Sequence, residues 1–286
     1  MSKIKVAELF YSIQGEGRYM GVPSVFLRTF GCNFTCGGFG LARGMRSDEN
    51  DRVFEQHKLH PFRDYKELPL VSTGCDSYAS WDPRFKDLSP MLTSDAIVER
   101  TMEILPHKRW RDEHFIFTGG EPLLGWQRSY PDILDHNNMQ DLKEITFETN
   151  GTQKLHKEFK DHLAQWSRKN GRTRESITFS VSAKLSVSGE KKEEAILPEV
   201  VAEYGEVGHV YLKFVVADQT DVQEAMEAVK DYRQAGFSGS VYLMPVGGVE
   251  SVYHMNNRTV AELAMKIGYR YSDRLQVPLF KNAWGT

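Results

Sequence analysis

Short β-rich runs alternate with helical segments from about residue 90 to the end of this 286-residue chain. Residues 94–105, for example, place their apolar side chains on one face of a helix. Strands that alternate with helices pair in parallel, because the helix carries the chain back to the starting edge of the sheet. The β-rich runs that we expect to form parallel strands are 113–118, 144–149, 176–181, 209–216 and 240–244.

The same pattern extends toward both ends of the chain. Residues 23–30 and 271–277 add an early and a late strand, which gives about seven strands. A helix begins near residue 220, where Thr220 and Gln223 fit a capping box, and another covers 260–267. About seven strands suit either a doubly wound sheet or an incomplete (β/α) barrel.

The charge balance and hydropathy exclude two classes of function. The chain has 36 Lys and Arg against 39 Asp and Glu, a net charge of −3, so it lacks the basic excess of a general nucleic-acid-binding protein. No apolar run approaches the roughly 18–20 residues of a membrane span. The first residues show no secretory signal, and we expect a cytoplasmic protein without direct nucleic-acid or membrane partners.

The three cysteines are candidates for a metal centre. Cys32 and Cys36 occupy a loop directly after strand 23–30, and Cys75 is the third cysteine. An odd number argues against a disulfide framework and favours a reducing compartment. Three thiolates suit an iron–sulfur cluster with one open iron, or a zinc site completed by His57 or His60. The cysteines alone leave both alternatives open.

Polar residues follow three consecutive expected strands. They are Thr118-Gly-Gly-Glu121-Pro, Glu148-Thr-Asn150-Gly and Ser182-Ala-Lys184. Each group alone is typical of an ordinary turn or strand end. Because parallel strands end at the same edge of a sheet, where α/β folds place their sites, the three groups together indicate a binding site beside the cysteine loop.

Arg28 is a charge within an otherwise apolar strand. It alternates with Phe26 and Phe30 and therefore shares their face, where an unpaired charge is costly. A guanidinium in this position suits a carboxylate ligand, and the alternative is an internal ion pair with Glu16.

Together, these motifs resemble those of the radical S-adenosylmethionine (SAM) enzymes. The segments Ser12-Ile-Gln-Gly-Glu-Gly, Gly21-Val-Pro-Ser-Val-Phe-Leu-Arg-Thr-Phe-Gly-Cys-Asn33, Cys75-Asp-Ser77 and Ser80-Trp-Asp82 resemble one branch, the 7-carboxy-7-deazaguanine synthases. The resemblance extends from about residue 8 to the C-terminus, where Trp284-Gly285 is similar to some members. The N-terminal motif is the specific one, since the later motifs are shared across the superfamily.

The resemblance implies a single radical SAM domain over residues 1–286, built as an incomplete (β/α) barrel. It also implies a [4Fe–4S] cluster on Cys32, Cys36 and Cys75, with SAM on the open iron. The implied reaction is a carbon–nitrogen lyase step: 6-carboxy-5,6,7,8-tetrahydropterin loses ammonia and gives 7-carboxy-7-deazaguanine. This product serves tRNA queuosine or DNA modification. The rival functions are an activase that makes a glycyl radical on a partner protein, and a zinc-binding module without catalysis.

The resemblance also assigns residues to the cofactors and the substrate. Ser77 is the implied ligand of a Mg²⁺ shared with the substrate. The implied SAM-binding residues are Gly74, Asp76, Gly120, Glu121, Glu148, Asn150, Ser182, Ala183, Lys184, Met244, Pro245, Val246 and Gly247. The implied substrate-binding residues are Ile13, Gln14, Gly15, Glu16, Arg28, Thr118 and Thr286, the last through its terminal carboxylate. The implied partners are a second copy in a homodimer and a flavodoxin-like or other low-potential reductant.

The chain departs from the family pattern in two places. The family has its cysteines close together as CxxxCxxC, whereas here an insertion, residues 37–74, separates Cys36 from Cys75 by 38 residues. In a flexible loop this adds roughly 2.6 kcal/mol of closure entropy, which is small beside cluster-binding energies. The insertion holds six basic and six acidic residues without clear periodicity, which indicates a solvated surface.

The second departure is Met244-Pro245, where many members have Gln before Pro.

Overall fold

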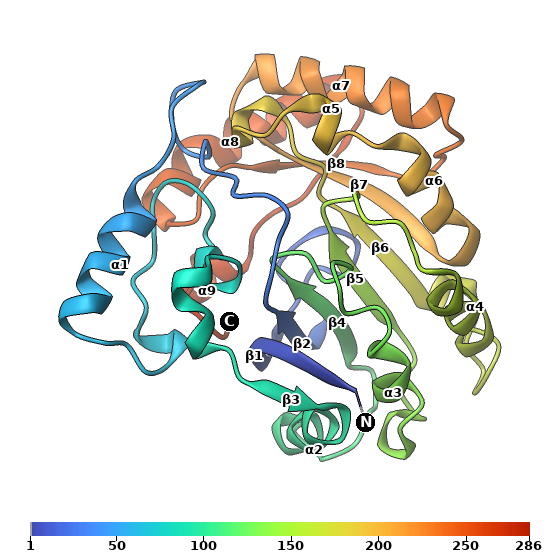
Figure 1. The fold of residues 1–286 in the computed structure, drawn as a ribbon. Helices are drawn as coiled ribbons and strands as arrows, with labels where there is room; N and C mark the ends of the chain where they lie inside the picture. The colour runs from blue at the N-terminus through green and yellow to red at the C-terminus, as the bar shows by residue number, and fades with distance from the viewer. Residues whose placement is uncertain (1) are drawn as a thin grey trace.

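The computed structural model describes residues 2–286, and the strands of these residues form one nine-stranded sheet (Figure 1). Its order is β3-β1-β2-β4-β5-β6-β7-β8-β9, with β1 antiparallel to β2 and β3 and every other pair parallel. The strands are β1 Lys3–Ile13, β2 Pro23–Thr29, β3 Met91–Thr93, β4 His114–Gly119, β5 Ile145–Thr149, β6 Ile177–Val181, β7 His209–Val216, β8 Val241–Pro245 and β9 Arg270–Tyr271.

From β2 onward the order follows the chain in one direction without reversal, whereas a doubly wound sheet reverses its order at a switch point. The sheet is also open, because β3 and β9 lie at opposite edges. The expected incomplete barrel is therefore confirmed.

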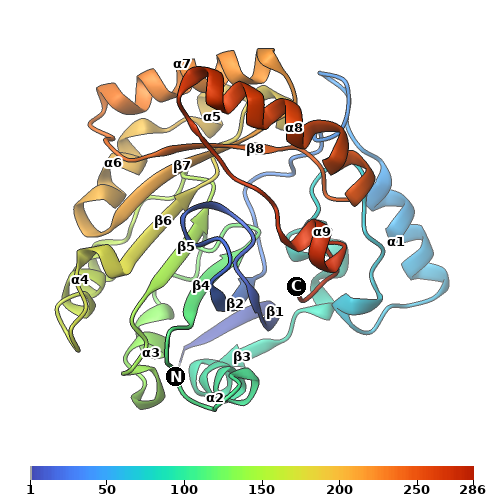
Figure 2. The same ribbon diagram turned by 180° about the vertical axis from the view of Figure 1, so that it is seen from behind.

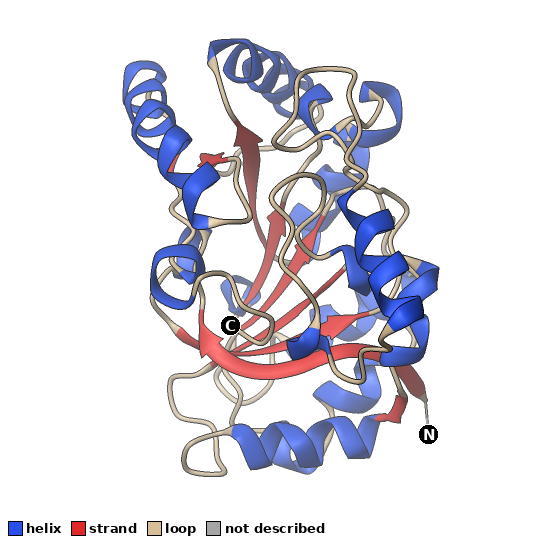
Figure 3. Ribbon diagram, turned by 90° about the vertical axis from the view of Figure 1, so that its left-hand side faces the viewer, coloured by secondary structure: helices blue, strands red, loops and turns tan. Residues whose placement is uncertain are grey.

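Helices cover the outer side of the curved sheet, as Figures 1 and 3 show, and the C-terminus lies on the inner side. Figure 2 shows α1 and α9 together at one end of the sheet. None of the helices within residues 2–286 combines the length and apolar character needed to cross a membrane. The helices are α1 Glu49–Leu59, α2 Ser94–Ile104, α3 Tyr130–Leu134, α4 Lys157–Trp166, α5 Lys192–Ala195, α6 Pro198–Val207, α7 Gln219–Gln234, α8 Glu250–Ile267 and α9 Gln276–Phe280.

The two-residue period of the strands separates the core from the inner face. Phe117, Phe147 and Phe179 pair in register across β4, β5 and β6, and all three are fully buried. Their rings stack at centroid distances of 4.7 and 5.3 Å. Because successive side chains of a strand point to opposite faces, the next residues, Thr118 and Glu148, face the inner side of the sheet.

Two local expectations are wrong, and two strands were not expected. The antiparallel strands β1 and β3 are the unexpected ones, and they lie outside the repeating strand–helix pattern. The expected strand 271–277 is reduced to β9, because the chain then leaves the sheet and forms α9. The helix that begins at Gln219 is capped by Asp218, whose side chain accepts from the amides of Thr220 and Asp221, rather than by a Thr220 capping box.

The insertion 37–74 folds into ordered structure. It contains α1 and a 3-10 turn at Tyr65–Glu67, and Val53, Tyr65, Leu68 and Val71 form a small apolar cluster with Tyr78 and neighbouring residues. The amide of Gly74 donates to the carbonyl of Phe39 at 2.8 Å, which ties the two ends of the insertion together.

Candidate functional site

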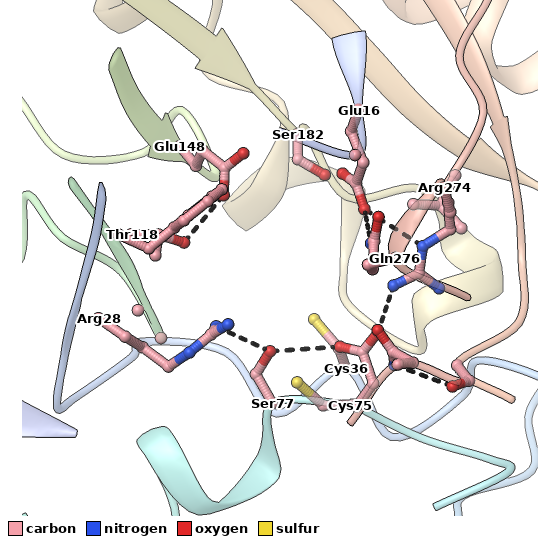
Figure 4. Close-up of a pocket in the computed structure, with 18 of the residues that line it drawn as sticks. Glu16, Arg28, Cys36, Cys75, Ser77, Thr118, Glu148, Ser182, Arg274 and Gln276 are labelled. Atoms are coloured by element: carbon pink, nitrogen blue, oxygen red, sulfur yellow. Dashed lines mark hydrogen bonds and ion pairs between the residues drawn. The ribbon is translucent and has the colours of Figure 1, made fainter. Parts of the chain in front are cut away.

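One pocket lies on the inner side of the sheet, where the carboxyl ends of the parallel strands meet the loops after β1 and β2 (Figure 4). The strand ends contribute Thr118 from β4, Glu148 from β5 and Met244 from β8. Residues 282–286 at the C-terminus also line the pocket. The site therefore lies where the sequence pattern predicts it.

The three cysteines line this pocket together, although 38 residues separate the last two. All three thiols are free, Cys36 is buried, and Cys32 and Cys75 are half-buried. Figure 4 shows the sulfurs of Cys36 and Cys75 side by side. The tie between Gly74 and Phe39 explains how a long insertion leaves its two ends adjacent.

Burial keeps these thiols neutral in the absence of a metal. It raises the pKa of Cys32 to about 12 and raises the pKa values of Cys36 and Cys75, while the Lys184 ammonium opposes the shift at all three. Metal ligation requires thiolates, so binding of a metal centre here releases protons.

The histidines of the zinc alternative lie elsewhere. His57 Nδ1 accepts from the amide of Phe62 at 3.0 Å, its ring stacks on Phe62, and His60 is exposed. Neither lines the pocket. Within residues 2–286, no three His, Cys, Asp or Glu residues are gathered as ligands of a single ion. The zinc site with His57 or His60 is therefore not formed.

Glu121 joins two strand ends instead of facing the pocket. Its carboxylate accepts from the amide of Asn150 at 2.6 Å, from Thr149 Oγ1 at 2.8 Å and from the amide of Leu123 at 3.0 Å. The side chain is fully buried, and burial raises its pKa to about 7 despite these hydrogen bonds. Of the residues assigned to SAM, those that do not line the pocket are Glu121, Ala183 and Pro245.

Three of the residues assigned to the substrate, Gln14, Glu16 and Thr118, belong to one hydrogen-bonded set that also includes Glu148. Gln14 Nε2 donates to Glu148 Oε1 and Thr118 Oγ1 donates to Glu148 Oε2, both at 2.9 Å. Gln14 Oε1 in turn accepts from the amide of Glu16 at 3.0 Å. Glu148 was assigned to SAM by resemblance, but these contacts join it to the substrate side.

Arg28 has an internal partner, but that partner is Glu8. The Nε–Oε2 distance is 2.9 Å, so the expected alternative pair with Glu16 is wrong. Arg28 Nη1 donates to Ser77 Oγ at 3.2 Å, so the two Nη atoms of the guanidinium point into the pocket (Figure 4). Ser77 precedes the 3-10 turn Tyr78–Ser80 without capping it through its side chain. Its hydroxyl donates to Asp76 Oδ1 at 3.3 Å, and Ser77 lines the pocket.

Sequence reasoning missed the cations around Glu16. Lys213 forms an ion pair with Glu16 Oε2, Arg274 Nε lies 3.2 Å from Oε1, and Gln276 Nε2 donates to Oε1 at 2.7 Å. Burial alone raises the pKa of Glu16, but Lys213 and Arg274 outweigh it and lower that pKa to about 2. Arg274 also pairs with Asp76, the neighbour of Cys75.

One of these missed residues had a detectable signal. Lys213 is a lone charge in the apolar strand β7. An unpaired charge on such a strand is costly, and this cost singles out Lys213 as it singled out Arg28. Arg274 follows β9 in irregular chain, where no periodicity indicates its direction.

No protein-family model matches the chain. It is 31% identical to the 7-carboxy-7-deazaguanine synthase of Halobacterium salinarum, over 98% of this chain and 91% of the relative. It is 26% identical to the 7-carboxy-7-deazaguanine synthase of Pyrobaculum aerophilum, over 99% and 97% of the two chains. The crystal structure of QueE from Escherichia coli has the same fold, with a TM-score of 0.53, 17% identity and coverage of 96% and 94%.

Proposed function

The chain belongs to the 7-carboxy-7-deazaguanine synthase family, and we propose that its pocket converts 6-carboxy-5,6,7,8-tetrahydropterin to 7-carboxy-7-deazaguanine with loss of ammonia. The family consists of radical SAM enzymes of 7-deazapurine biosynthesis. The observation that carries the proposal is that one pocket is lined both by three free thiols and by a polar set that includes Arg28, Thr118 and Glu148.

The cysteines of the pocket fit a [4Fe–4S] cluster and SAM. Three cysteines without a fourth leave one iron open, and a Cβ on Gly120 would lie 2.8 Å from Cys32 Cβ, so the glycine keeps the backbone of β4 beside the cluster loop. When bound, the reduced cluster and SAM supply the radical that abstracts a hydrogen atom from the substrate. The proposed SAM contacts are Gly74, Asp76, Gly120, Asn150, Ser182, Lys184, Met244, Val246 and Gly247.

The polar residues of the pocket fit a pterin that carries a carboxylate. We assign the Nη1–Nη2 edge of Arg28 to the substrate carboxylate, because a guanidinium can bind a carboxylate through two parallel hydrogen bonds while Nε keeps its ion pair with Glu8. Gln14, Thr118 and Glu148 supply donors and acceptors for the ring, with Ile13 and Gly15 beside them. An activase that acts on a protein backbone has no need for this set, which favours a small substrate.

The remaining assignments belong to the same proposal. Ser77 is the proposed ligand of a Mg²⁺ that the substrate shares, since Mg²⁺ prefers oxygen ligands and completes its octahedron with substrate and water. Thr286 lines the pocket and is a further proposed substrate contact, through its terminal carboxylate. We further propose a homodimer in a reducing, cytoplasmic compartment, a low-potential reductant such as a flavodoxin, and residues 37–74 as an insertion in one radical SAM domain.

Anaerobic turnover tests the function. The full chain is reconstituted with iron and sulfide and incubated with SAM, a reductant and the tetrahydropterin, and the deazapurine is measured by mass spectrometry. We expect a brown protein that makes 7-carboxy-7-deazaguanine in a SAM-dependent reaction. A colourless zinc protein, or an iron protein that cleaves SAM but never makes the deazapurine, would overturn the proposal.

A further inference from the structure

Glu190 lies outside the pocket, yet its carboxylate contacts the cysteine loop. Oε1 accepts from the amide of Cys36 at 2.7 Å and from the amide of Thr35 at 2.9 Å. Thr35 Oγ1 lies 3.3 Å from the same oxygen. A single carboxylate oxygen therefore binds two successive backbone amides, one of which belongs to a cysteine of the pocket.

These contacts stabilise an uncommon backbone conformation. Cys36 has a φ of 49°, in the left-handed region that non-glycine residues rarely adopt. Successive amides around a left-handed residue converge on one point and form a site for an anion. The Glu190 carboxylate occupies this point and stabilises the left-handed conformation of Cys36. This conformation places the Cys36 side chain in the pocket.

The chain around Glu190 is itself firmly held. The amide of Glu190 donates to Ser188 Oγ at 3.2 Å, and the buried Ser188 donates from Oγ to the carbonyl of Leu185 at 2.6 Å. The amide of Gly38 donates to the carbonyl of Ser188 at 2.9 Å. A Cβ on Gly38 would lie 2.8 Å from the nitrogen of Gly189, so the two backbones are in direct contact. The segment after β6 is thus a fixed support for the cysteine loop.

We propose that Glu190 is a positioning residue for the cluster: its carboxylate sets the shape of the cysteine loop before the cluster binds, and its negative charge lowers the reduction potential of the bound cluster. This inference rests on the proposed function, because it takes Cys36 as a cluster ligand. Among the residues assigned by resemblance, none lies in the segment around Glu190.

The sign of the charge effect follows from electrostatics. Reduction adds an electron to the cluster, and a carboxylate hydrogen-bonded to the amide of a ligating cysteine disfavours that added charge. Two cations near the cysteine loop oppose this effect of the Glu190 charge. Arg46 Nη2 donates to Thr35 Oγ1 at 2.6 Å, and Lys184 lies on the pocket side with Ser182. Since neither cation contacts Glu190, replacing the carboxylate by an amide leaves both in place.

Three full-length variants separate the two roles. Glu190→Gln keeps an acceptor oxygen and removes the charge, whereas Glu190→Ala removes both. Glu194→Gln is the matched control, because Glu194 lies in α5 nearby, is 56% exposed and pairs only with Lys191. The measurements are amide exchange at Thr35 and Cys36 in the metal-free chain, iron content after reconstitution, and the midpoint potential of the cluster.

In the metal-free chain we expect Glu190→Ala to speed exchange at these amides about ten- to a hundredfold, the range set by loss of a hydrogen bond to a charged group. We expect Glu190→Gln to retain iron and to shift the midpoint potential upward, with Glu194→Gln unchanged. Parent-like exchange in Glu190→Ala overturns the positioning role, and a parent-like potential in Glu190→Gln overturns the charge effect. If the parent chain binds no cluster, the proposed function is wrong, but the amide-exchange measurement on the metal-free chain still tests the positioning role of Glu190.

Discussion

Arg274 links three segments that line the pocket, and Arg274→Lys tests how much this link contributes. The guanidinium contacts Glu16 after β1, Asp76 beside Cys75, and the carbonyl oxygen of Gly247 after β8. Its side chain is only 10% exposed. A lysine ammonium is a shorter-reaching single point of charge that cannot span the separate positions of Glu16 and Asp76 as the guanidinium fork does, so we expect one of these two carboxylates to lose its contact with residue 274.

The magnitude follows from the burial of these partners. Removing one member of a buried ion pair costs about 3–5 kcal/mol, because the other charge stays buried and unpaired. Here Lys213 still faces Glu16, and the Asp76 side chain is 29% exposed. Both features reduce the cost, and we expect Arg274→Lys to lower the free energy of unfolding by about 2–3 kcal/mol.

Denaturant unfolding of the metal-free chain measures this loss, and SAM binding to the reconstituted enzyme provides a second readout. Arg258→Lys is the control, because the ion pair of Arg258 with Glu262 is 88% and 58% exposed and contributes no more than about 0.5 kcal/mol. SAM affinity should fall only in Arg274→Lys, since Asp76 is a proposed SAM contact. Equal unfolding free energies for the two variants would refute the reasoning.

Three further predictions concern the substrate side. Arg28→Lys should lower kcat/KM for formation of the deazapurine by about a hundredfold or more, while SAM cleavage without substrate persists. The reason is that an ammonium cannot replace the guanidinium that Glu8 orients. Turnover equal to that of the parent would show that Arg28 serves only in the internal ion pair with Glu8. In Ser77→Ala, added Mg²⁺ should no longer accelerate turnover, and the iron content should be unchanged. If turnover of the variant rises with Mg²⁺ as it does in the parent, the assignment of Ser77 as a Mg²⁺ ligand is wrong. The rings of Trp284 and Tyr65 pack edge to face with their centroids 5.3 Å apart, and Trp284 is only half-buried, so Trp284→Ala should destabilise the chain by about 1–2 kcal/mol, less than a fully buried Trp would. It should also raise KM for the pterin, and an unchanged KM would exclude a role of Trp284 in positioning residues 282–286.

The parallel strands were predictable because each is a short run rich in β-branched and aromatic residues that lies between helical segments. The expected run 209–216 matches β7 in full, and the runs that became β4, β5, β6 and β8 differ by one residue at their ends. The antiparallel β1 shows buried and half-buried residues without regular alternation, and pairing with β2 makes it a strand. Such tertiary pairing is not encoded in a local window of sequence.

The site was predictable by position but not by side-chain direction. The motifs at the strand ends correctly located the pocket, since parallel strands end at one edge of the sheet. Glu121 nevertheless turns toward Thr149 and Asn150, after a backbone bend at Gly119, where φ is 151° and a Cβ would lie 2.3 Å from the carbonyl oxygen of Thr29. The sequence Gly-Gly-Glu-Pro indicates a turn without indicating which way the carboxylate points.

The insertion shows why cysteine spacing is a poor guide to this centre. A flexible loop of its length adds roughly 2.6 kcal/mol of closure entropy over a short one. The folded insertion offsets this cost with its own apolar cluster and with the hydrogen bond from Gly74 to Phe39, which brings the chain back beside Cys36. On the other side, Glu190 fixes the conformation of the Cys36 loop from the segment after β6. The cysteines are therefore held by contacts on both sides of the loop, and the length of chain between them is free to vary.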